Sequence, residues 1–150
     1  MKRILKSPLT NAFCISMFTI FYALVFLLTH ENIDFENSMN YGNASSLWFM
    51  WHTFLVAGHQ IYIAYALVVV TLLVVVLLVL RRRPYDEYHT SILTNCLVVA
   101  IVLTMIAIAI FYVVILNNPY NIVEKFTLFI VMHWTTVVFA NLVYVILCRR

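Results

Sequence analysis

The distribution of charge along the chain constrains its fold more than any other feature. The nine Lys and Arg residues and the six Asp and Glu residues gather in short groups, and long uncharged stretches separate these groups. The four uncharged stretches are residues 7–30, 37–80, 88–123 and 126–148. A helix needs about 20 apolar residues to cross about 30 Å of hydrocarbon, and each stretch holds such a run. The sequence therefore predicts four transmembrane helices.

Composition and periodicity exclude the other fold classes. The chain is 65% hydrophobic and 10% charged, whereas soluble domains average about half apolar and about a quarter charged. Lipid offers no partner to an open strand edge, and the apolar runs lack the alternation of a barrel. We therefore expect an all-α integral membrane protein, a single domain over residues 1–150 whose helices form a four-helix bundle. The expected spans are residues 9–28, 61–80, 92–116 and 126–148.

The placement of the basic residues predicts the orientation of these spans. In a four-span scheme, Lys125 flanks one side of the membrane and all other basic residues flank the opposite side. Cytoplasmic flanks are enriched in Lys and Arg, so we expect both termini and the middle loop in the cytoplasm, in a plasma membrane or a bacterial inner membrane. Basic and aromatic residues are not interleaved as in RNA-binding proteins, so no nucleic-acid partner is expected. The basic residues on the cytoplasmic side are Lys2, Arg3, Lys6, Arg81, Arg82, Arg83, Arg149 and Arg150.

The second apolar stretch is too long for one simple span. As a straight helix, residues 47–80 would measure roughly 50 Å, well beyond the hydrocarbon thickness. Residues 46–59 contain Trp48 and Trp51, and aromatic side chains of this kind favour the membrane–water interface. We therefore expect an extra interfacial helical segment over residues 46–59 and a bend near Gly58. The alternative is one long helix that tilts or projects above the membrane.

The histidines are the candidate ligands of this chain. Counted along the helices from the cytoplasmic basic residues, His30, His59 and His133 lie toward the outer leaflet, and His52 would share a face with His59 on a continuous helix. One interpretation is a haem or transition-metal site in which His59 and His133 are ligands, with His52 or His30 as substitutes. The other interpretation is that these imidazoles hydrogen-bond to headgroups, water or a neighbouring helix.

Small and polar residues mark two helix faces that we expect to pack against other helices. In lipid, small side chains allow helices to approach closely, and polar side chains hydrogen-bond between helices. Asn95 and Asn11 are further candidates for buried polar contacts. The first face carries Cys96, Ala100, Thr104 and Ala107, and the second carries His133, Thr136, Ala140 and Tyr144, with Asn141 beside it.

The sequence also contains three cysteines and one glycosylation sequon. Cys14, Cys96 and Cys148 stand at no metal-type or redox-type spacing, and we interpret them as packing residues. Asn43 begins an N-glycosylation sequon in the first outer loop, and this sequon would be used only in a eukaryotic host.

These observations favour a non-catalytic function. Charged residues inside a span mark ion paths and proton relays, and the predicted spans contain no Lys, Arg, Asp or Glu. Catalytic nucleophile motifs and phosphate-binding loops are also absent from the sequence. We therefore expect no enzyme and no cofactor, but an accessory subunit, assembly factor, regulator or immunity-type protein whose partners are the lipid bilayer and other membrane subunits or its own copies. The alternatives are a haem- or metal-binding redox subunit and a lipid or small-molecule binding or transport component.

Overall fold

The computed structural model describes residues 7–30, 46–80, 86–117 and 122–148, and within these ranges every regular element is an α-helix. Four helices are long and apolar enough to cross a membrane, as the sequence predicts. They are α1 (Pro8–His30), α3 (Gln60–Leu80), α4 (Glu87–Asn117) and α5 (Ile122–Leu147), and a shorter helix, α2 (Ser46–Val56), precedes α3.

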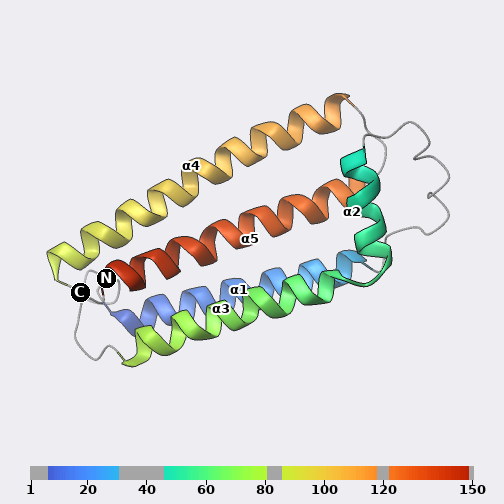
Figure 1. Ribbon diagram of the computed structural model, residues 1–150. Helices are drawn as coiled ribbons and strands as arrows, with labels where there is room; N and C mark the ends of the chain where they lie inside the picture. Colours follow the sequence, from blue (N-terminus) through green and yellow to red (C-terminus); the bar gives the residue numbers. More distant parts are fainter. Residues whose placement is uncertain (1–6, 31–45, 81–85, 118–121, 149–150) are drawn as a thin grey trace.

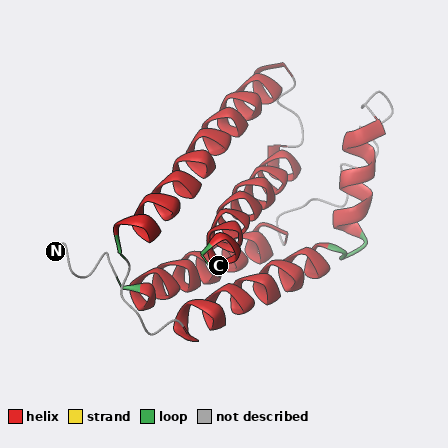
Figure 2. Ribbon diagram, turned by 60° about the vertical axis from the view of Figure 1, so that its left-hand side comes forward, coloured by secondary structure: helices red, strands yellow, loops and turns green. Residues whose placement is uncertain are grey.

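The four long helices run in alternating directions, and α5 lies at the centre (Figure 1). Helix α5 contacts each of the other four helices, whereas α1 and α3 pack against each other and against α5. Helix α4 packs mainly on α5, on the side away from α1 and α3, and the second view shows the same arrangement (Figure 2). The start of α1, the end of α3, the start of α4 and the end of α5 lie together at one end.

The long second apolar stretch is divided into two helices, as expected from its length. Helix α2 ends at Val56, a turn covers residues 57–59, and α3 begins at Gln60. Gly58 has a φ of 76°, a left-handed conformation that residues with a Cβ rarely adopt. Its amide donates to the carbonyl of Leu55 at 2.9 Å, which ends α2 and turns the chain into α3.

The boundaries of α4 and α5 differ from the predicted spans. The prediction began the last two spans near residues 92 and 126, but the helices begin at Glu87 and Ile122. The side chain of Asp86 accepts the amide of His89 at 2.9 Å, so the first turn of α4 is capped by a polar residue. Both helices carry a glutamate in the first turn, where the helix dipole favours an acid.

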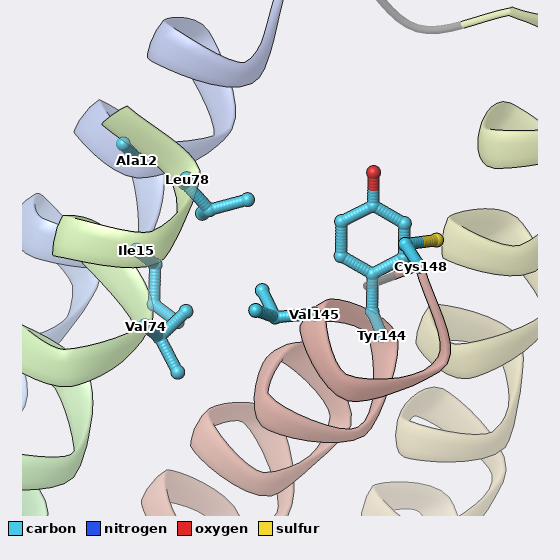
Figure 3. Close-up of a cluster of buried hydrophobic side chains, with 7 residues drawn as sticks. All are labelled: Ala12, Ile15, Val74, Leu78, Tyr144, Val145 and Cys148. Carbon is cyan, nitrogen blue, oxygen red and sulfur yellow. The ribbon is translucent and has the colours of Figure 1, made fainter. Parts of the chain in front are cut away.

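Two clusters of buried side chains, mostly apolar, lie between α1, α3 and α5. One cluster lies near the end of α5, where Val145 points toward α1 and α3 while the thiol of Cys148 points to the opposite side (Figure 3). Its members are Ala12, Ile15, Val74, Leu78, Tyr144, Val145 and Cys148. The second cluster, toward the other end, comprises Phe26, Ala64, Leu67, Ile130, Trp134 and Val138.

A buried hydrogen-bond network joins three helices between these clusters. The hydroxyls of Thr19 in α1 and Thr71 in α3 lie 3.1 Å apart, and the indole of Trp134 in α5 donates to Thr19 at 3.4 Å. Since all three side chains are buried, these bonds replace water as their partners. The network holds α1, α3 and α5 in register near mid-length.

Candidate functional site

Helix α2 is fastened to the beginning of α5 by polar contacts. Nε1 of Trp51 donates to the carbonyl of Glu124 at 2.9 Å and lies 3.3 Å from the hydroxyl of Thr127. Nδ1 of His52 lies 3.3 Å from Oε1 of Glu124, and both side chains are buried. We call Trp51, His52, Glu124 and Thr127 the α2–α5 clasp. It holds the short helix across one end of the long ones (Figure 1).

The spacing of residues in α2 explains which of its faces meets α5. Trp48, Trp51, His52 and Leu55 follow a helical three- and four-residue spacing and therefore lie on one face. Leu55 is fully buried, and the ring of Trp48 lies under Nζ of Lys125 at 5.6 Å from the ring centroid. A cation over an indole face is attractive, so the ammonium group of this buried lysine has a favourable position.

The sequence did not predict the clasp. The expected last span begins at residue 126 and leaves out Glu124 and Lys125, but both lie in the first turn of α5 and both are buried. A charged pair that interrupts two apolar runs is the usual mark of a helix end. Here both charged residues belong to α5, because His52 and Trp48 of α2 contact their side chains. No spacing rule connects residues that lie 72 positions apart in the chain.

The predicted histidine ligands have different partners. His52 pairs with Glu124, and the imidazole of exposed His59 donates to the carbonyl of Ala57 at 3.1 Å. His133, on α5, hydrogen-bonds through Nδ1 to the hydroxyl of Tyr22 on α1. The side chain of His30 lies outside the described residues. Among the described residues, no three His, Cys, Asp or Glu side chains form a group that could hold a metal ion.

His133 is instead the centre of an aromatic contact between helices. Its ring lies edge-on to Tyr22 and to Phe18, with centroid separations of 5.2 and 5.7 Å. Phe129, one turn earlier on α5, lies at 6.2 Å. These contacts and the hydrogen bond to Tyr22 provide a structural role for the imidazole, joining α1 to α5.

Residues from the two predicted small faces meet in a groove between α4 and α5. Its volume is about 510 Å³, and no charged residue lines it among the residues described. We call it the α4–α5 groove. The predicted residues Cys96 and Ala100 of α4 line it together with Thr136 and Ala140 of α5. Its remaining lining residues are Asn95, Val99, Leu103, Thr135, Phe139 and Val143.

The other predicted face residues lie outside this groove. Thr104 donates its hydroxyl to the carbonyl of Ala100 at 2.8 Å, within α4. Ala107 borders a smaller cavity of about 50 Å³ nearer the clasp. Asn141 is buried, and its Oδ1 accepts a 3.4 Å hydrogen bond from Asn11 of α1, as expected for interhelical polar residues.

Asn95 differs from its expected environment. The sequence interpretation placed it in a buried contact, but it is exposed on α4 at the edge of the groove. Asn11 and Asn141 bond to each other because α1 and α5 pack directly, whereas α4 packs mainly against α5 and leaves Asn95 exposed. Asn95 makes no side-chain hydrogen bond to any described residue.

Comparison with protein-family models, with curated proteins and with solved structures finds no match to this chain. Inferences about function therefore rest on the geometry of the clasp and the groove.

Proposed function

We propose that this chain is a small polytopic membrane protein that acts without catalysis, through helix contacts in the bilayer. Its class is that of an accessory subunit, assembly factor, regulator or immunity-type protein. The α4–α5 groove is the observation that carries the proposal. In lipid, helices associate by close packing and interhelical hydrogen bonds, and small residues such as Ala100 and Ala140 permit that approach.

The environment of α4 supports this proposal. Of its 31 residues, Ala100 alone is buried, because α4 packs mainly against α5. A helix in the interior of a bundle has neighbours on several sides, but one flank of α4 here opens into the groove. A transmembrane helix of another subunit is the element whose shape and polarity fit an uncharged groove between two helices.

The composition of the groove also favours contact over catalysis. Its lining consists of apolar side chains, two threonines, one asparagine and one cysteine, without a carboxylate or imidazole. Imidazoles and carboxylates are the side chains most often used in general acid–base catalysis. The groove therefore has the features of a packing surface.

We further propose that the four long helices form a bundle that spans the membrane with both termini in the cytoplasm. The start of α1, the end of α3, the start of α4 and the end of α5 share one end of the structure. In the sequence, the basic groups at residues 2–6, 81–83 and 149–150 adjoin these four helix ends. The positive-inside rule assigns that end to the cytoplasm of a plasma membrane or a bacterial inner membrane. Helix α2 would then lie at the outer interface.

A variant that fills the groove tests the proposed function. The protein is solubilised gently, and its mass is measured by native mass spectrometry. We expect a species heavier than the 17.5 kDa chain, containing a second polypeptide. Ala140→Phe should release that polypeptide, whereas Ala109→Phe, at an exposed α4 position outside the groove, should retain it. A strictly monomeric wild-type protein with no co-purifying chain would contradict the proposal.

The groove also supports a second candidate function, a lipid or small-molecule binding component. Its volume of about 510 Å³ falls within the range of about 300–1,000 Å³ that is typical of ligand pockets. Most of its lining is apolar, which suits an acyl chain. In the same native mass experiment, this function predicts a mass increment of lipid size that Ala140→Phe removes, without a second polypeptide.

A further inference from the structure

The exposed amide of Asn95 is the starting point for identifying what occupies the groove. Asn95 lies eight residues after Glu87, roughly 12 Å along the helix axis, and it lines the groove beside Cys96 and Val99. Neither its amide nitrogen nor its amide oxygen bonds to a described residue. An occupant that covers this amide excludes water from it, and burial of an amide without a hydrogen-bond partner is unfavourable, so the occupant should offer it hydrogen bonds.

An amide is complementary to another amide. The side chain of asparagine carries two N–H donors and a carbonyl acceptor, so two facing asparagines can form hydrogen bonds in both directions. In a second copy with the same membrane orientation, Asn95 lies at the same depth. A twofold axis along the membrane normal places equivalent residues opposite each other, as in most symmetric dimers.

The shape and charge of α4 suit the groove of a second copy. From Tyr88 to Asn117, α4 contains no Lys, Arg, Asp or Glu, which matches the uncharged lining. Val99 and Leu103 project from the edge of the groove as exposed apolar side chains, one turn apart. The small residues Ala100 and Ala140 leave space for such side chains from another helix.

We propose that a second copy of this chain occupies the groove, with α4 of each copy seated between α4 and α5 of the other and the two Asn95 amides facing each other. This inference rests on the proposed function, because it names the partner helix. The exchange is mutual, so the assembly closes as a dimer and leaves neither groove open.

Disulfide crosslinking in intact membranes tests whether a second copy of the chain occupies the groove. Cys14, Cys96 and Cys148 are replaced by alanine, and each variant then receives one new cysteine on α4. The variants are compared in pairs whose cysteines lie two residues apart, on opposite faces of the helix. The first pair is Val99→Cys and Ile101→Cys, whose parent side chains are 58% and 60% exposed; the second is Leu103→Cys and Met105→Cys, at 49% and 62%. Size-exclusion chromatography of each variant confirms that the chain still folds.

The proposal predicts a disulfide-linked dimer from the groove-side cysteines at positions 99 and 103, since a disulfide needs Cα atoms within about 7 Å. The cysteines at positions 101 and 105 should give several-fold less dimer. Equal crosslinking at all four positions, or no homodimer at positions 99 and 103, would overturn it. If a different polypeptide co-purifies in the native mass measurement while these cysteines form no homodimer, the proposed function stands and the second copy is excluded.

Substitutions of Asn95 test the amide contact separately. Asn95→Leu should weaken dimerisation on the order of ten-fold, in the upper range for one interhelical polar contact, whereas Asn95→Gln should retain most of it. Energy transfer between donor- and acceptor-labelled copies, diluted in lipid vesicles, provides the dimerisation constant. An unchanged constant for Asn95→Leu would refute the facing amides.

Discussion

Nδ1 of His52 lies 3.3 Å from Oε1 of Glu124, and this buried pair joins the short helix α2 to the first turn of α5. Burying an acid requires a partner that replaces its hydration, and the imidazole provides one. The indole of Trp51 binds the backbone carbonyl of the same glutamate, so two adjacent residues of α2 hold one residue of α5. Glu124 therefore joins α5 to α2 through two adjacent residues of α2.

Replacement of Glu124 by alanine should lower the free energy of unfolding by about 1–3 kcal/mol, because the buried imidazole of His52 loses its contact with the carboxylate of Glu124. Glu87→Ala is a matched control, since Glu87 also lies in the first turn of a helix but is exposed. The control should cost at most about 1 kcal/mol, the size of the helix-dipole effect. Unfolding in mild detergent, followed by circular dichroism, measures both. Equal losses would show that the pair with His52 contributes nothing.

Gly58→Ala should destabilise the protein by about 1–2 kcal/mol through backbone strain alone. The φ of 76° is unfavourable for alanine, but a Cβ at this position would meet no atom within 4 Å. Gly58→Asn should cost less, because asparagine tolerates the left-handed conformation better. Thermal unfolding of the two variants checks this order. If alanine and asparagine were equally tolerated with no loss, the turn would not require the positive φ.

The hydroxyls of Thr19 and Thr71 should be energetically coupled. A double-mutant cycle with Thr19→Val and Thr71→Val should give a coupling energy of about 0.6 kcal/mol, and at most about 1.7 kcal/mol, as measured for hydrogen bonds between transmembrane helices. Valine is similar to threonine in volume, so each substitution at these buried positions removes the hydroxyl without opening a large cavity. Strictly additive effects of the two substitutions would indicate that the 3.1 Å contact does not stabilise the fold.

The orientation proposed for the helices predicts opposite labelling at their two ends. Cysteines introduced at exposed Ala57, beside α2, and at exposed Glu87, at the start of α4, are compared in a cysteine-free chain. A membrane-impermeant thiol reagent added to intact cells should label position 57 and not position 87. Labelling of position 87 alone would show that the orientation is opposite to the proposed one.

The sequence predicted the helices well because the requirement for apolar length is local. Four spans, a separate α2 and a break at Gly58 all follow from hydropathy, aromatic placement and a length limit. Several of the small residues expected at helix contacts line the α4–α5 groove. Ala100 and Ala140 are examples, although the sequence did not show that their helices face each other.

The sequence could not predict which side chains pair between helices. Along these helices, core-facing and lipid-facing residues are both apolar, so hydropathy does not distinguish the two faces. The partners of His52 and His133 are Glu124 and Tyr22, which lie 72 and 111 positions away in the chain. Their pairing depends on the tertiary arrangement, which the spacing of histidines along the sequence does not reveal.

Photo-crosslinking in intact membranes tests most directly whether another polypeptide fills the α4–α5 groove. A photoreactive amino acid is placed at Val99, on the groove, and at Ile101, on the opposite face. Position 99 should crosslink to a defined polypeptide, and position 101 should crosslink to lipid. Lipid adducts alone at both positions would contradict it.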